Sequence, residues 1–146
     1  MRPTHTRIAA TFTLLGLAAL GAGCGKPPDA PGGHGDQVAE GGLLYVAHCA
    51  KCHGPTGAGT EGSPAVVGKG ALPLDPPPTA KTRKAQFRTG KDVLDFIRVS
   101  MPKDAPGSLS ETQYADILAF DLKLNKVDLH GLRVNESNAS TFILHP

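Results

Sequence analysis

The pattern that most constrains this chain is the pentapeptide Cys49-Ala50-Lys51-Cys52-His53. Two cysteines three positions apart at the end of a helix project from the same side of the backbone. A histidine follows the second cysteine directly, and C-x-x-C-H is the pattern at which a haem is attached covalently. We therefore predict that Cys49 and Cys52 form thioethers with the two vinyl groups of one haem c.

The same pentapeptide predicts how the haem iron is held. Nε2 of His53 is expected to be the proximal ligand, while an outer acceptor holds Nδ1. For the opposite side we predict Met101, the single methionine after the initiator, because it lies at an expected helix end in a loop rich in proline and glycine. His34, His130 and His145 are the alternatives. With both axial positions filled, electron transfer is favoured over oxygen binding or peroxidase chemistry.

Other interpretations of the two cysteines have less support. A structural zinc site needs four ligands, commonly from two clusters, and the sequence has no second cysteine pair. A thioredoxin-like redox pair accompanies a βαβ pattern, which the sequence lacks. A disulfide between Cys49 and Cys52 would close too small a loop to stabilise the fold much.

The N-terminal segment predicts export from the cytoplasm. Residues 1–23 carry two arginines and then an apolar run from Ile8 to Leu20, which is typical of a secretory signal peptide. The run is too short to span a bilayer comfortably. Small residues then precede Cys24, and this resembles the lipobox of bacterial lipoproteins. We predict a lipid anchor on Cys24; ordinary cleavage that leaves a free or buried cysteine is the alternative.

The charge balance argues against nucleic-acid binding. The chain has 15 basic and 13 acidic residues, and two of the arginines lie in residues 1–23. The remainder therefore lacks the basic surplus that nucleic acid requires. Basic residues still cluster between positions 81 and 103, which indicates either a solvated surface or a docking patch for acidic redox partners. These residues are Lys81, Arg83, Lys84, Arg88, Lys91, Arg98 and Lys103.

Composition also divides the chain into segments. Residues 24–37 are rich in proline and glycine, so we predict the lipid anchor and a flexible linker there. The folded domain is expected at 38–126, and 127–146 form a C-terminal tail of uncertain structure.

Apolar periodicity predicts an all-α domain with three main helices around the haem. The helices are expected from Val38 to Ala50, from Thr89 to Val99, and from the Ser110 cap to Leu124. Thr89 with Asp92, and Ser110 with Gln113, have the spacing of capping boxes. Long loops rich in glycine and proline join the helices, and wrapping of a haem edge would organise such loops.

Residues 38–124 resemble class I cytochrome c. The first helix of that family carries G-x-x-x-[FY]-x-x-x-C-x-x-C-H, and here Gly41 and Tyr45 precede the pentapeptide at that spacing. The resemblance implies that Ile117 and Phe120 of the last helix pack against Gly41 and Tyr45. It also implies that the Pro64 carbonyl accepts a hydrogen bond from Nδ1 of His53.

Two longer stretches resemble small monohaem cytochromes and the cytochrome modules of quinoprotein dehydrogenases. They are FRTGKDVLDFI and MPKDAPGSLSETQYADILAF, and the second begins at Met101. The resemblance implies an electron carrier, not an enzyme, that serves extracytoplasmic partners such as a dehydrogenase, an oxidase or a respiratory complex. The alternative is a cytochrome subunit held tightly in a quinoprotein dehydrogenase or respiratory complex. Localisation is expected on the periplasmic side, at a membrane.

Overall fold

The computed structural model describes residues 34–146. The predicted signal peptide, Cys24 and most of the predicted linker lie outside this range. Within it, no helix has the length and apolar character that a membrane span requires.

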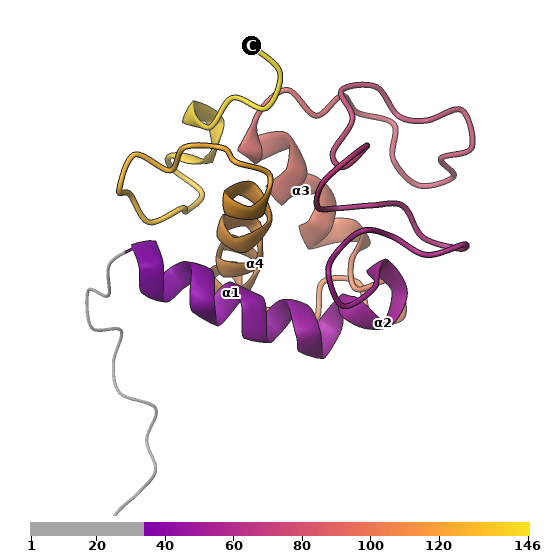
Figure 1. The fold of residues 1–146 in the computed structure, drawn as a ribbon, viewed down its shortest axis with the longest axis horizontal. Coiled ribbons are helices and arrows are strands. Elements are labelled where there is room, and N and C mark those ends of the chain that lie inside the picture. The colour runs from indigo at the N-terminus through magenta and orange to yellow at the C-terminus, as the bar shows by residue number, and fades with distance from the viewer. Residues whose placement is uncertain (1–33) are drawn as a thin grey trace, which may run out of the picture.

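The described part of the chain is helical, and Figure 1 shows α1 running across α4 with α3 close by. The elements are α1 His34–His48, α2 Ala50–His53, α3 Gly90–Ser100, α4 Glu111–Leu124 and a 3-10 turn η1 Ala139–Thr141. In place of strands, the described residues have only two isolated bridges, Thr60 with Ser63 and Thr89 with Ile143. The predicted all-α class is therefore confirmed.

Two helices, α3 and α4, begin at the local signals that the sequence predicts. The Thr89 backbone N–H donates to Asp92 Oδ2 at 2.8 Å and begins α3. Ser110 and Gln113 exchange hydrogen bonds of 2.9 and 3.2 Å at the start of α4. Both predicted capping boxes are thus present. α3 ends at Ser100, one residue beyond the predicted end.

The first helix begins earlier than predicted. It begins at His34 rather than Val38, so residues 34–37 are helical and not linker. Gln37 explains the extra turn, because its side chain is buried. Its Nε2 donates to Asp116 Oδ1 at 3.0 Å and to the Val134 carbonyl at 2.8 Å.

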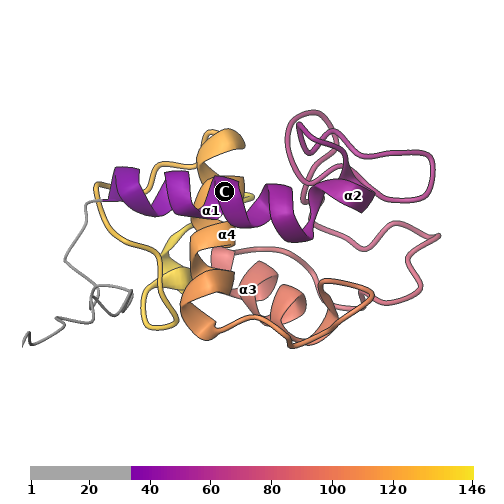
Figure 2. The same ribbon diagram turned by 90° about the horizontal axis from the view of Figure 1, so that it is seen from below.

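A close crossing of α1 and α4 forms the frame of the domain (Figure 2). A Cβ on Gly41 would lie 1.9 Å from the Asp116 carbonyl oxygen, so only glycine allows the two backbones to approach this closely. The rings of Tyr45 and Phe120 pack beside the crossing, with centroids 5.3 Å apart. The expected contacts of Gly41, Tyr45 and Phe120 are confirmed, and Ile117 is buried on the same helix.

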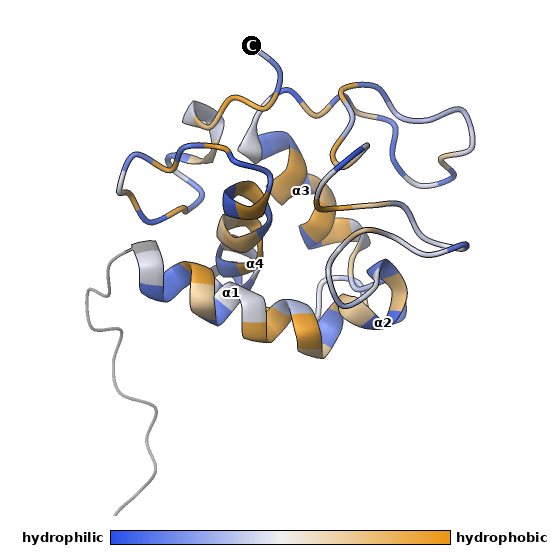
Figure 3. Ribbon diagram, viewed as in Figure 1, coloured by the Kyte–Doolittle hydropathy of each residue, from blue (hydrophilic) through white to orange (hydrophobic). Residues whose placement is uncertain are grey.

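The C-terminal tail completes the hydrophobic core. Phe142 is buried with Leu94, Leu118 and Leu122 of α3 and α4. Its carbonyl accepts from the Gly90 backbone N–H at 2.8 Å, at the start of α3. Figure 3 shows apolar residues, in orange, recurring along α1, α3 and α4 among polar ones. Residues 127–146 are therefore part of the domain and not an appendage.

Candidate haem-attachment site

The cysteine pair lies where α1 gives way to the short α2. The Cys49 backbone N–H donates to the Tyr45 carbonyl at 2.8 Å, which continues the helical pattern of α1. Cys49 is half-buried, Cys52 is exposed, and both thiols are free. Gly54, with φ of +80°, ends α2 directly after His53. Two thiols are thereby presented on one helical turn at the edge of the domain.

The loop after the pentapeptide holds it in place. The Gly59 backbone N–H donates to the His53 carbonyl at 2.9 Å. Thr60 Oγ1 donates to the Cys52 carbonyl at 2.8 Å. The Tyr45 hydroxyl donates to the Gly54 carbonyl, also at 2.8 Å. The carbonyls at the C-terminal end of α2 are thus satisfied by residues around it.

The imidazole of His53 is oriented by a backbone carbonyl. Its Nδ1 lies 2.8 Å from the Pro64 oxygen, the contact that the family resemblance implied. A carbonyl only accepts, so Nδ1 carries the proton and Nε2 keeps its lone pair. This is the tautomer that a metal-binding histidine requires. That His53 binds iron stays a prediction.

The loop that carries Pro64 is held by hydrogen bonds to Gly57 and to Asn125. The Gly57 carbonyl accepts from the backbone N–H groups of Val66 and Val67 at 2.8 and 2.9 Å. Asn125, just after α4, donates through Nδ2 to the Val66 carbonyl at 2.8 Å and accepts from the Gly68 N–H at 3.0 Å. Sequence reasoning missed Asn125, because nothing in its neighbourhood signals a contact with a loop that lies 57 residues away.

Met101 lies at the C-terminal end of α3 and is half-buried. Its carbonyl accepts from the Tyr114 hydroxyl at 2.7 Å, which fixes the backbone of the methionine against α4. Asp104 of the same loop lies 3.5 Å from Lys51 Nζ, within the pentapeptide. Both side chains are exposed, so the pair stabilises little. The contact nevertheless shows that the methionine loop lies beside the cysteine pair.

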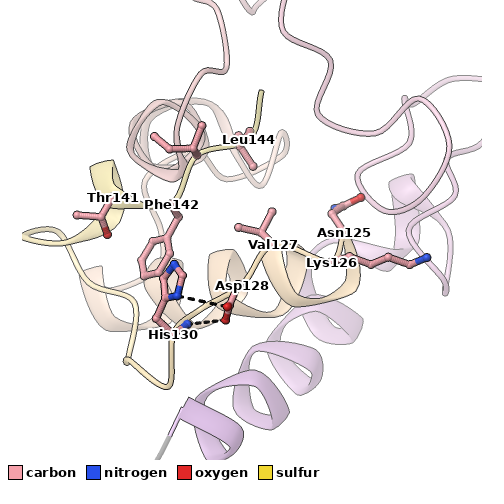
Figure 4. A pocket seen from close by; sticks show the side chains of 9 residues that line it. Asn125, Lys126, Val127, Asp128, His130, Thr141, Phe142 and Leu144 are labelled. Carbon is pink, nitrogen blue, oxygen red and sulfur yellow. Dashed lines mark hydrogen bonds and ion pairs between the residues drawn. The ribbon is translucent and has the colours of Figure 1, made fainter. Parts of the chain in front are cut away.

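The alternative histidine ligands have other partners. His130 lies 3.3 Å from Asp128, and His145 Nε2 lies 2.9 Å from the Leu72 carbonyl. Figure 4 shows His130 and Asp128 at a pocket formed by the end of α4 and the tail. None of the cysteines, His53 or Met101 lines that pocket. The His34 side chain is not among those described.

The basic residues between positions 81 and 103 do not form one free patch. Arg83 is buried, donates to the Pro73 carbonyl at 2.7 Å and lies over the Phe87 ring at 3.9 Å. Lys91 and Arg98 both pair with Glu136. Arg83 is therefore not available to a docking partner, while docking by the remaining basic residues stays a prediction. The exposed members are Lys81, Lys84, Arg88 and Lys103.

A buried acid lies near the cysteine pair. Asp121 of α4 has a side chain with 4% exposure, and its Oδ1 has no hydrogen-bond partner among the described residues. Burial raises its pKa to about 8. Burial, with a smaller contribution from the charge of Asp121, raises the pKa values of Tyr45 and Cys49 to about 12. No sequence pattern predicted this residue.

These donors fit a covalently attached haem. Two thiols on one turn are available for thioether bonds, and the tautomer of His53 leaves Nε2 free for a metal. A thioether side chain lies in the loop that touches the pentapeptide. A histidine nitrogen and a methionine sulfur are the axial ligand pair of cytochromes c.

Comparison with known proteins agrees with this geometry. Residues 36–120 match the family model described as cytochrome C oxidase, cbb3-type, subunit III. The chain belongs to this cytochrome c family. It is thus a class I c-type cytochrome, with the all-α fold, the covalent haem c and the electron-transfer function that the family implies.

One solved structure contains a chain that is similar to this cytochrome. A chain in the crystal structure of the sulfane dehydrogenase SoxCD from Paracoccus pantotrophus is 27% identical, with a TM-score of 0.56. The match covers 73% of this cytochrome and 52% of that chain, so this chain spans about half of the other's length. The predicted similarity to dehydrogenase cytochrome modules is confirmed. A search of curated proteins gave no match.

Proposed function

We propose that this cytochrome is a carrier of single electrons between redox proteins outside the cytoplasm and has no catalytic activity of its own. The observation that carries the proposal is the hydrogen bond from Nδ1 of His53 to the Pro64 carbonyl. It leaves Nε2 as the ligating nitrogen, while Met101 offers a thioether from a loop that touches the pentapeptide. A site with both axial positions filled exchanges electrons and offers no position for a substrate.

The protein's own residues keep the site rigid. The haem supplies one-electron chemistry when bound, its iron alternating between the ferric and ferrous states. Cys49 and Cys52 hold it by thioether bonds that dilution cannot reverse. Pro64 fixes the ring of His53, and Tyr114 fixes the backbone of Met101. Because these hydrogen bonds hold both ligand-bearing segments in place, we expect the surrounding structure to rearrange little when an electron moves.

The decisive experiment is maturation in a bacterium that exports and assembles c-type cytochromes. We expect a pyridine haemochrome spectrum of haem c, a mass increase of one haem, and a reversible one-electron redox titration. The variant with both Cys49→Ser and Cys52→Ser is the control and should be colourless. Colourless wild-type protein, with both thiols open to alkylation, would refute the proposal.

A second candidate is a cytochrome subunit bound tightly to a dehydrogenase or respiratory complex. The similarity to a SoxCD chain favours it. Leu43 and Val46, on the outer side of α1, are also 69% and 66% exposed, as expected of a surface that a partner covers. Size-exclusion chromatography of gently solubilised native membranes separates the two candidates. A free carrier elutes near its own mass, whereas a subunit elutes with a larger complex.

We further propose a lipid anchor at Cys24 and a location on the periplasmic side of a membrane. The support is the predicted signal peptide and the small residues before Cys24. Several acyl chains on one residue anchor a protein stably. Cys24→Ser should therefore move the cytochrome from the membrane to the soluble periplasmic fraction, as measured by haem staining. Full membrane retention of the variant would contradict the anchor.

A further inference from the structure

Asp121 is a buried acid whose environment does not compensate a negative charge. Its side chain is 4% exposed, and its Oδ1 has no partner among the described residues. A buried carboxylate without partners is costly, so the carboxyl group is favoured in its neutral form. Such a group does not stabilise the fold when ionised, and a hydrophobic residue would pack at the same position without that cost.

Asp116, one and a half turns earlier on α4, shows the contrast. It is also buried, with 7% exposure. However, it accepts from Gln37 Nε2 at 3.0 Å and lies 3.6 Å from Arg133 Nη2. The two acids therefore share a helix and a degree of burial, and differ in whether a hydrogen-bond donor and a cation accompany them.

Asp121 lies close enough to the attachment site to act on it electrostatically. Across the α1–α4 contact, its negative charge contributes to the raised pKa values of the Tyr45 hydroxyl and the Cys49 thiol. Cys49 is one of the two cysteines that we propose to bond the haem. Burial is the cause of the raised pKa of Asp121. A charge in this interior is poorly screened, because little water or salt reaches it.

We propose that Asp121 is a proton-exchanging group coupled to electron transfer, binding a proton when the protein is reduced and releasing it on oxidation. The inference rests on the proposed function. In the reductive step a redox protein donates one electron, and solvent supplies one proton to the Asp121 carboxylate. In the oxidative step the electron passes to an acceptor protein and the proton returns to solvent.

The coupling follows from charge. An added electron makes the interior more negative, so the neutral form of Asp121 is favoured in the reduced protein. By linkage, an ionised Asp121 favours the oxidised protein to the same extent. The midpoint potential should therefore be higher when Asp121 is protonated and lower when it is ionised. Because burial raises the pKa of Asp121 to about 8, both forms are accessible under ordinary conditions.

The test is a potentiometric titration of the mature holoprotein between about pH 5 and pH 10. For wild type we expect a constant potential at low pH, a fall across the region near pH 8, and a second plateau. One proton per electron corresponds to a slope of at most about 59 mV per pH unit. Asp121→Asn should abolish the fall. Asp121→Leu gives a second measurement, should the amide prevent folding.

Asp116→Asn is the matched control, since it alters a buried acid of α4 that has partners. It should retain the wild-type dependence on pH. A difference infrared spectrum between reduced and oxidised protein should also show a carboxylic C=O stretch that both Asp121 variants lack. A pH slope that persists in the Asp121 variants, or a wild type without one, would overturn the inference. Neither outcome contradicts the proposed function. That function fails only if the mature protein shows no reversible one-electron redox titration.

Discussion

At the scale of the residue, the site depends on hydrogen bonds from outside the pentapeptide. Pro64 determines the tautomer of His53, and Asn125 anchors the loop that carries Pro64. Tyr114 holds the backbone of Met101. The predicted ligands are thus held by polar groups that we do not expect to bind the haem, as is general for metal sites.

The role of Met101 is tested by Met101→Ala. We expect the haem to stay attached, because its thioethers do not involve this residue. The midpoint potential should fall, because loss of the thioether ligand removes its preference for reduced iron. The far-red sulfur-to-iron absorption band of the oxidised protein should disappear. Leu109→Ala, a half-buried apolar residue of the same loop, is the control and should keep the band. An unchanged band in Met101→Ala would rule out the ligand.

Asp121 also makes the stability of the fold depend on pH. Its pKa is raised from 3.8 to about 8 by burial, so the native protein binds this proton more tightly than the unfolded chain does. The free energy of unfolding contributed by this group therefore decreases as pH rises from about 4 through 8. Urea unfolding at several pH values should show that Asp121→Asn gains stability relative to wild type as pH increases. A constant difference between the two proteins would contradict this.

At the scale of the element, the crossing of α1 and α4 positions the cysteine pair. α1 contributes Gly41 to the crossing and Tyr45 to the ring contact, and it ends immediately before Cys49. A shift of α1 would consequently displace the thiols relative to the loop that holds His53.

Gly41→Ala should disrupt this crossing. The new Cβ would meet the Asp116 carbonyl at 1.9 Å, so the helices must move apart. We expect a loss of more than about 3 kcal/mol in the free energy of unfolding and poor haem incorporation. Gly35→Ala, in the same helix with nothing within 4 Å of its Cβ, is the control. It should be neutral or slightly stabilising, because alanine favours helices. Equal stability of the two variants would show that the crossing of α1 and α4 does not require a glycine at position 41.

At the scale of the whole molecule, the tail makes the domain one cooperative unit. Residues after α4 return to α1 through Val134 and to α3 through Phe142. An ion-pair group of Lys91, Arg98 and Glu136 links α3 to the same tail on the surface. The three helices are therefore joined by the segment that follows them in the chain.

Phe142→Ala tests the contribution of the tail. Phe142 is 1% exposed, and truncation of a buried phenylalanine costs about 3–5 kcal/mol. The neighbouring Ile143 is 51% exposed, so Ile143→Ala should cost far less. Thermal unfolding followed by both haem absorbance and circular dichroism should show one transition, shifted to lower temperature in Phe142→Ala. A tail that does not support the core would leave the two variants alike.

What the sequence determined by itself is local or covalent. The spacing of Cys49, Cys52 and His53, the capping boxes of α3 and α4, and the match of Gly41 and Tyr45 to a family pattern could all be predicted. Each depends on residues a few positions apart, whose geometry the backbone dictates.

What only the tertiary structure decided depends on contacts between distant segments. The anchoring by Asn125, the buried and unpaired state of Asp121, the burial of Arg83 and the place of Phe142 in the core are of this kind. Whether a polar side chain is solvated, paired or isolated is decided by what packs against it. That neighbour comes from elsewhere in the chain, so no local pattern records it.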